Sequence, residues 1–228
     1  MGHSVNIERI KSVFDALGKL AEECVFVGGA TVSLYADRMA EEVRPTDDVD
    51  ILVEIANLMD FTAMEEKIRG LGFQNDMQAK FIGRYRLRDI IIDLMPTDPK
   101  ILGFSNKWYS EGFKKAIDYS LDKTRIIKIL ESPYFLATKI EAFKNRGKGD
   151  GRTSSDFEDI IFILENRDAI WEEVASSDDK IKQYLKKEFM IFLKNPFFEE
   201  WVEAYMLPYA SSTAYIQGNI KNILESKT

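Results

Sequence analysis

The chain has 228 residues, of which 45% are apolar and 30% charged, a composition that supports one large core or two smaller ones and gives no indication of disorder. The longest apolar runs fall far short of the roughly 18 residues that a membrane helix needs, and the N-terminus lacks a signal-peptide pattern, so we expect a cytoplasmic protein with no membrane partner. With one cysteine, one histidine and a net charge of −7, the sequence excludes an internal disulfide, a histidine-based zinc site and a Ser-His-Asp triad.

The N-terminal half alternates helical and strand patterns. Apolar residues recur at helical spacing in NIERIKSVFDALGKLAEE, whereas CVFVGG and DVDILVEI are typical of short strands, the first of which ends in a glycine turn. These patterns predict an α/β or α+β fold, with helices packed against a sheet. We expect helices over 6–23, 30–40 and 61–72, and strands over 24–29, 48–55, 81–87 and 89–95.

Beyond Pro96 the pattern changes to helices. The segment SPYFLATKIEAFKNRG has a serine N-cap, a proline at the first helical position and a glycine past its end, which are consistent start and stop signals. We expect an N-terminal α/β domain over residues 1–125 and a C-terminal helical domain over residues 126–228. The helices of the second domain are expected over 132–147, 156–168, 178–195, 196–207 and 212–226.

Basic residues are concentrated in the middle of the chain. Residues 80–152 contain 16 basic and 9 acidic residues, a net charge of +7, which leaves −14 for the remainder. Arg84, Arg86 and Arg88 alternate along one predicted strand in this region. A solvated charged surface explains the uneven distribution about as well as a groove that faces phosphate groups. For the three arginines, a groove that binds nucleic acid or nucleotide and an exposed edge strand protected by charge are equally open.

The acidic cluster at the start of one predicted strand carries the clearest chemical signal. Side chains alternate along a strand, so Asp48 and Asp50 point to the same side while Val49 and Ile51 enter the core. Two close carboxylates repel each other unless a cation neutralises them, and Mg²⁺ is commonly held by carboxylates together with substrate phosphates. Asp93 lies in a strand expected alongside and completes a candidate three-carboxylate site.

A glycine pair separates the first predicted strand from the next helix. Gly28 and Gly29 leave room for a phosphate at the helix N-terminus, where free N–H groups attract anions, and Thr31 and Ser33 add hydroxyl donors. A close contact between helix and strand that needs no ligand is the alternative. The surrounding sequence is neither a Walker loop nor G-x-G-x-x-G.

The succession of strand, Gly-Gly, helix, D-x-D and a later aspartate resembles the nucleotidyltransferase fold of the DNA polymerase beta superfamily over residues 25–96. In that superfamily the glycine pair holds a nucleoside triphosphate (NTP), and three carboxylates bind two Mg²⁺ ions. The resemblance implies a nucleotidyltransferase-type mixed sheet with flanking helices, an NTP substrate and two Mg²⁺ ions. It assigns the phosphate contact to Gly28 and Gly29 and the metal to Asp48, Asp50 and Asp93.

A narrower resemblance rests on RPTDDVDILV and on FLATKIEAFKNRGKGDGRTSSDFEDIIFIL. Both segments are similar to those of the AbiEii group, the nucleotidyltransferase-like toxins of bacterial abortive-infection and toxin–antitoxin systems and their relatives. The resemblance implies an RNA end, such as that of tRNA, as acceptor and an antitoxin protein as partner. It adds Arg44, Thr46, Lys139, Arg146 and Asp156 to the nucleotide site, with Lys139 also catalytic.

Lys139 and Arg146 lie seven residues apart on one predicted helix and on nearly the same face, so both are candidates to neutralise a triphosphate. Surface ion pairs with Glu141, Asp156 or Asp159 are the alternative. Helix capping or a salt bridge is the preferred interpretation of Asp159.

The leading hypothesis is a Mg²⁺-dependent nucleotidyltransferase that moves a nucleoside monophosphate from an NTP to an acceptor. A small-molecule nucleotidyltransferase of the aminoglycoside type and a non-catalytic nucleotide-binding protein are the alternatives. Base preference, acceptor and oligomeric state stay open, and Asp47 has no assigned role.

Overall fold

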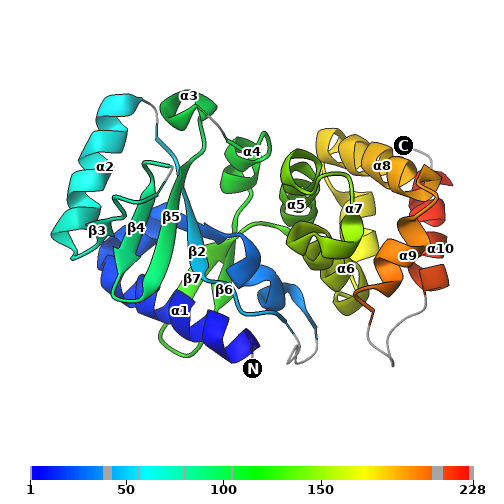
Figure 1. The fold of residues 1–228 in the computed structure, drawn as a ribbon, viewed down its shortest axis with the longest axis horizontal. Helices are drawn as coiled ribbons and strands as arrows, with labels where there is room; N and C mark the ends of the chain where they lie inside the picture. The colour runs from blue at the N-terminus through cyan, green and yellow to red at the C-terminus, as the bar shows by residue number, and fades with distance from the viewer. Residues whose placement is uncertain are drawn as a thin grey trace. The chain divides into compact units, whose positions relative to one another are not determined.

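The computed structural model describes residues 2–37, 43–55, 57–79, 81–103, 105–206 and 213–225. The chain divides into two compact units. Unit 1 comprises Met1–Ser33 and Ala40–Glu131, and unit 2 comprises Leu34–Met39 and Ser132–Thr228. Figure 1 shows that the strands belong to unit 1 and that unit 2 is helical.

The described strands of unit 1 form one mixed sheet in the order β3-β4-β5-β2-β1-β7-β6. The β2–β5 and β1–β7 pairs are parallel, and the other neighbouring pairs are antiparallel. The strand bounds are β1 Cys24–Val27, β2 Asp48–Val53, β3 Gln74–Asn75, β4 Arg84–Leu87, β5 Ile90–Pro96, β6 Ile117–Ser120 and β7 Ile126–Ile129.

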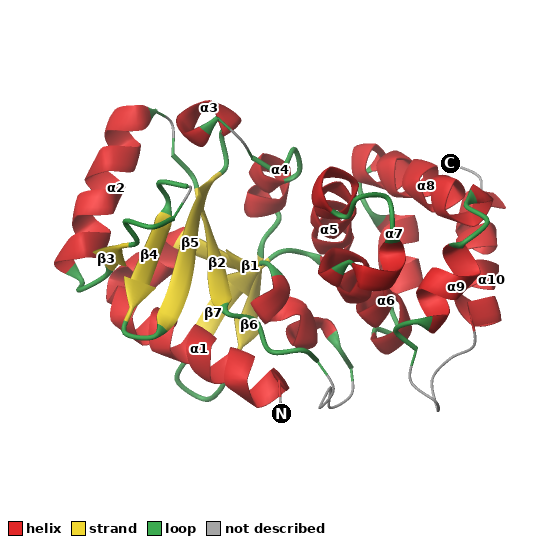
Figure 2. Cartoon of the chain, in the orientation of Figure 1, coloured by secondary structure: helices red, strands yellow, loops and turns green. Residues whose placement is uncertain are grey.

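Helices flank this sheet, as Figure 2 shows in red against yellow strands. The first helix buries Ile10, Val13 and Leu17, which share one face because they are three or four residues apart. The predicted mixed α/β architecture with flanking helices is therefore confirmed. The helical segments of unit 1 are α1 Gly2–Leu17, η1 Gly18–Glu23, η2 Gly29–Tyr35, α2 Leu58–Gly70, α3 Pro99–Leu102 and α4 Tyr109–Lys114, where η denotes a 3₁₀-helix.

Two predicted helices differ from the structure. The helix expected over 6–23 ends at Leu17, because Gly18 takes a φ of 53°, and continues as the tighter η1. The helix expected over 30–40 is the 3₁₀-helix η2, and residues 38–40 lie outside the described residues.

The prediction that only helices follow Pro96 is wrong, because β6 and β7 lie in that region. In β7 the residues alternate between exposed and buried, with Ile127 and Ile129 entering the core. This strand pairs in parallel with β1 and so belongs to the sheet of unit 1. The break between the compact units lies after Glu131, beyond β7 and close to the boundary expected near residue 125.

Unit 2 contains the predicted C-terminal helices and one further helix, α7. Its interior is rich in aromatic rings, among which Phe157 contacts Phe143 at a centroid distance of 5.2 Å and Trp201 at 5.5 Å. The helical segments are α5 Ser132–Arg146, η3 Gly151–Thr153, α6 Ser155–Asn166, α7 Ile170–Ser176, α8 Asp179–Lys194, α9 Phe198–Glu203 and α10 Thr213–Glu225.

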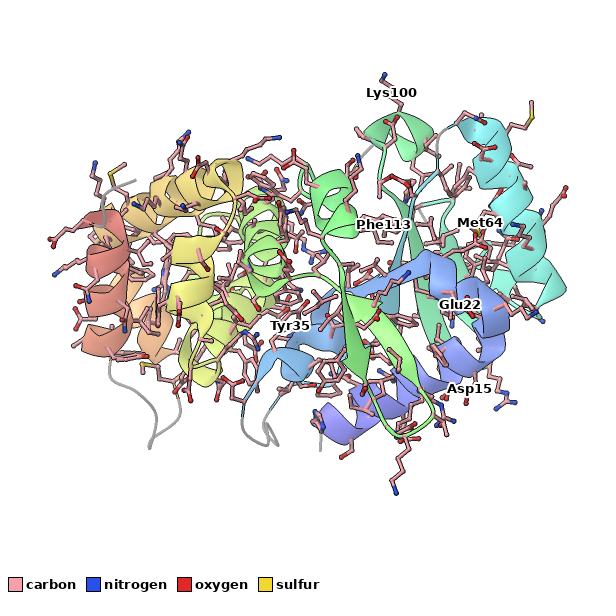
Figure 3. All side chains as sticks on the ribbon, turned by 180° about the vertical axis from the view of Figure 1, so that it is seen from behind. Asp15, Glu22, Tyr35, Met64, Lys100 and Phe113 are labelled. Carbon is pink, nitrogen blue, oxygen red and sulfur yellow. The ribbon has the colours of Figure 1, made fainter. Side chains whose placement is uncertain are left out.

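Tyr35, labelled in Figure 3, explains why a short stretch from the N-terminal half belongs to unit 2. Its ring packs on Phe135 of α5 with centroids 4.5 Å apart, and its backbone carbonyl accepts a hydrogen bond from Arg167. Burial raises the pKa of the Tyr35 hydroxyl well above its ordinary value.

Among the described residues, no helix is both long and apolar enough to cross a membrane.

Candidate metal centre

Three carboxylates converge at the neighbouring strands β2 and β5. The two strands are parallel, and their register places Asp50 directly opposite Asp93. Asp48 lies two residues before Asp50 and on the same face of β2. One oxygen from each of the three side chains lies within 4.8 Å of the others. The structure therefore brings together the three candidate metal ligands, which we call the aspartate triad.

The alternation along β2 explains how polar and apolar side chains share six residues. Val49 and Ile51 are fully buried in the core, whereas Asp48 and Asp50 are partly exposed on the other face. Asp93 is buried, with 7% of its surface exposed. Hard cations such as Mg²⁺ prefer carboxylate oxygens, so the donor set of the triad fits a divalent metal ion.

Arg84 of β4 is the cationic side chain that faces the triad. The register of β4 and β5 places Arg84 opposite Asp93. Its Nε and Nη2 atoms donate hydrogen bonds to the two oxygens of Asp93 at 2.7 and 2.6 Å, and Nη2 lies 3.6 Å from Asp48 Oδ2. Arg84 and the triad together carry a formal charge of −2, because one guanidinium opposes three carboxylates.

The pKa shifts of this pair show that Arg84 compensates for the burial of Asp93 only in part. Burial raises the pKa of the Asp93 carboxyl, and the hydrogen bonds and charge of Arg84 lower it by less. The hydrogen bonds to Asp93 in turn raise the pKa of Arg84 well above its ordinary value. The negative charges of Asp48 and Asp76 also raise the pKa of Asp93.

The other two arginines of this segment, Arg86 and Arg88, have different surroundings from Arg84. Arg86 pairs with Asp76 at 2.9 Å, and Arg88 lies in the turn between β4 and β5 with a φ of 57°. Of the two interpretations left open for this segment, that of an exposed edge strand is wrong, because β3 pairs with the outer side of β4.

Gly28 ends β1 directly against the triad. The register pairs Val27 with Asp50, and Gly28 follows with a φ of 76°, a conformation that favours glycine. A Cβ atom at this position would collide with the carboxylate of Asp50. The close approach that requires Gly28 is thus made by a triad carboxylate, and Gly29 begins the 3₁₀-helix η2.

The hydroxyl groups predicted to bind phosphate are both buried. Thr31 Oγ1 donates a hydrogen bond to the carbonyl of Gly28 at 3.0 Å and so stabilises the turn after β1. Ser33 is 5% exposed, and its Oγ has no hydrogen-bond partner among the residues that the structure describes.

Asn6 of α1 holds the segment that leads into β2. Its Nδ2 donates to the carbonyl of Arg44 at 3.1 Å, and its Oδ1 accepts from the backbone N–H of Thr46 at 2.9 Å. The Thr46 hydroxyl donates to the carbonyl of Asp48 at 3.0 Å. Thr46 therefore contacts the first triad residue, while the roles of Arg44 and Thr46 as nucleotide contacts stay a prediction. Sequence analysis missed Asn6, although a polar residue on the buried face of an amphipathic helix is a signal for such a contact.

The remaining predicted residues form a charge cluster in unit 2, of which all but Arg146 are buried. Lys139 Nζ lies 2.5 Å from Asp159 and 3.5 Å from Asp156, and Arg146 donates two hydrogen bonds to Asp156 at 2.6 and 2.7 Å. Lys139, Asp156 and Asp159 are each at most 5% exposed. These are the ion pairs that the sequence left open as an alternative. Lys139 makes its pairs in the buried interior, whereas the side chain of Arg146 is 69% exposed and reaches Asp156 from the surface.

Asp156 is held ionised by this cluster. Burial, the largest influence, raises its pKa, but the hydrogen bonds and charges of Arg146 and Lys139 together outweigh burial and leave the pKa of Asp156 below its ordinary value. The cluster thus joins α5 and α6 through paired charges.

A scan against models of protein families found no matching family, and a search of curated proteins found no matching protein.

Proposed function

We propose that this chain is a Mg²⁺-dependent nucleotidyltransferase that transfers a nucleoside monophosphate from an NTP to an acceptor, with pyrophosphate as the leaving group. The observation that carries the proposal is the aspartate triad, in which Asp48, Asp50 and Asp93 meet on one face of two parallel strands. The glycine turn that closes against Asp50 adds support, because it repeats the Gly-Gly and D-x-D association of the DNA polymerase beta superfamily, which the sequence resembles.

The triad would hold the metal, and two Mg²⁺ ions are expected from the resemblance. When bound, Mg²⁺ supplies positive charge that neutralises the triphosphate and stabilises the transition state. The chain's own contribution is to fix three carboxylates in strands whose apolar side chains are locked in the core. Such preorganisation lowers the reorganisation that ligand binding and reaction require.

The nucleotide would approach at the end of β1. The resemblance assigns the phosphate contact to Gly28 and Gly29, and Gly28 lies directly against the triad carboxylate of Asp50. The resemblance also assigns nucleotide contacts to Thr31, Ser33, Arg44 and Thr46 in unit 1 and to Lys139, Arg146 and Asp156 in unit 2. Thr31 and Ser33 are also candidates as hydroxyl donors, and Lys139 and Arg146 as cations on one helix face, whereas Arg44, Thr46 and Asp156 rest on the resemblance alone.

The acceptor and the partner are likewise proposed from the resemblance to the AbiEii group. An RNA end, such as that of tRNA, is the proposed acceptor, and an antitoxin protein is the proposed partner in the cytoplasm. A small molecule of the aminoglycoside type is the competing acceptor, and the test below includes both.

The test is transfer of label from α-³²P-labelled NTPs in the presence of Mg²⁺ to total RNA or to an aminoglycoside panel. We expect Asp48→Asn and Asp50→Asn to lower transfer by at least about 100-fold, the scale on which single catalytic electrostatic groups contribute. Asp47→Asn is the matched control, because Asp47 is the adjacent exposed carboxylate outside the triad. Wild-type rates in a folded Asp50→Asn variant would refute the proposal, and label in aminoglycosides but not RNA would reassign the acceptor.

A further inference from the structure

The position of the Arg84 guanidinium suggests a role beyond a static ion pair. Its Nη2 atom donates to Asp93 Oδ2 at 2.6 Å and lies 3.6 Å from Asp48 Oδ2. A single nitrogen thus lies near two of the three carboxylates that a metal ion would share. We infer that Arg84 is a built-in counter-ion of the triad, which a divalent cation must displace from Asp93 in order to bind. This inference rests on the metal site of the proposed function.

Geometry makes the two cations competitors. A Mg²⁺ ion bound to both Asp48 and Asp93 would lie about 2 Å from an oxygen of each. The Nη2 atom lies 3.6 Å from Asp48 Oδ2 and 2.6 Å from Asp93 Oδ2, so an ion that took these two oxygens would be in close contact with a like charge. One of the two cations therefore leaves when the other binds.

Arg84 has a path by which to leave. Its side chain is 31% exposed, whereas that of Asp93 is 10% exposed, so the guanidinium can turn towards solvent while the carboxylate stays in place. The long arginine side chain reaches other rotamers without a change in the backbone of β4. When the metal ion binds, the single positive charge of Arg84 at Asp93 is replaced by the two positive charges of the ion.

The exchange has a consequence for metal affinity. Without metal, Arg84 offsets the repulsion among the three carboxylates and the burial of Asp93. The same hydrogen bonds have to be broken when a metal ion binds, so Arg84 weakens metal binding by the strength of its pair with Asp93. If Arg84 served only to position Asp93 as a ligand, its removal would weaken metal binding instead. The two roles predict effects of opposite sign.

Calorimetric titration of Mn²⁺ without nucleotide tests this sign. We expect Arg84→Gln to bind Mn²⁺ about tenfold more tightly than wild type, the factor expected when a competing charged hydrogen bond is removed. Arg86→Gln is the matched control, because Arg86 is two residues further along the same face of β4 but pairs with Asp76. It removes one positive charge without freeing a triad carboxylate, and we expect a change of no more than about twofold, since its charge is exposed and screened.

The outcomes separate this inference from the proposed function. Unchanged or weaker binding by Arg84→Gln, or equal tightening by both variants, overturns the role of Arg84 while leaving the metal site intact. Absence of Mn²⁺ binding by wild type overturns both proposals. Loss of binding in Asp50→Asn supports the proposed site independently of Arg84.

A second measurement follows the Arg84 side chain in the wild-type protein by nuclear magnetic resonance. The Nε–H resonance of Arg84, assigned by comparison with Arg84→Lys, reports the hydrogen bond to Asp93 in wild-type protein. We expect saturating Mg²⁺ to shift this resonance to the position of a solvent-exposed arginine. An unchanged resonance in the Mg²⁺-saturated protein would show that Arg84 keeps its place and would overturn the inference.

Discussion

At the scale of single residues, the candidate site depends on positions that tolerate few other residues. Gly28 is the clearest example, because two independent features of the structure require glycine there. Its φ of 76° disfavours a side chain, and the carboxylate of Asp50 fills the space that a Cβ atom would need. The glycine therefore lets Asp50 lie against the end of β1.

We expect Gly28→Ala to impair both folding and metal binding. A non-glycine residue in this conformation costs about 1 to 2 kcal/mol, and displacement of Asp50 adds to that cost. Gly103→Ala is the matched control, since Gly103 has the same φ of 76° but open space around its Cβ position. Chemical denaturation and Mn²⁺ titration would measure the two effects. Equal destabilisation and equal metal affinity in both variants would contradict the proposed contact with Asp50.

At the scale of secondary-structure elements, the strand that bears two triad residues is anchored through the segment before it. Asn6 on α1 is fully buried and uses both ends of its side-chain amide to bind the backbone at Arg44 and Thr46. The helix thus fixes where β2 begins, and with it the position of Asp48.

We expect Asn6→Ala to lower the free energy of unfolding by about 1 to 3 kcal/mol, because it leaves two backbone groups without their partner. It should also weaken Mn²⁺ binding, since the entry to β2 loses its anchor. Ser12→Ala, an exposed position on the same helix, is expected to change neither quantity. An Asn6→Ala variant as stable as Ser12→Ala would show that the hydrogen bonds of Asn6 contribute nothing net.

Elements with a strong local pattern were predictable from sequence, and those that depend on distant partners were not. The alternation in DVDILV placed Asp48 and Asp50 on one face, and the isoleucine run before Asp93 gave β5. By contrast, β6 is a mostly exposed edge strand and β7 has four residues, so neither carries a long pattern. The pairing of Arg84 with Asp93 follows from strand register, which the sequence of either strand does not contain.

At the scale of the whole molecule, the chain separates its charged clusters between two units. The aspartate triad and Arg84 lie in unit 1, where the described residues retain a local excess of negative charge. The cluster of Lys139, Arg146, Asp156 and Asp159 lies in unit 2, where two cations and two anions are paired. Taken by themselves, the four residues of the second cluster sum to zero formal charge, whereas Arg84 and the three triad carboxylates sum to −2.

The most direct test of the metal site is the anomalous scattering of Mn²⁺ in crystals grown with a non-hydrolysable NTP analogue. We predict an anomalous peak within bonding distance of Asp48, Asp50 and Asp93, with the triphosphate of the analogue beside Gly28. Asp50→Asn crystals grown in the same way should lose the peak. A well-ordered analogue bound elsewhere, or Mn²⁺ bound away from the triad in wild-type crystals, would contradict the account.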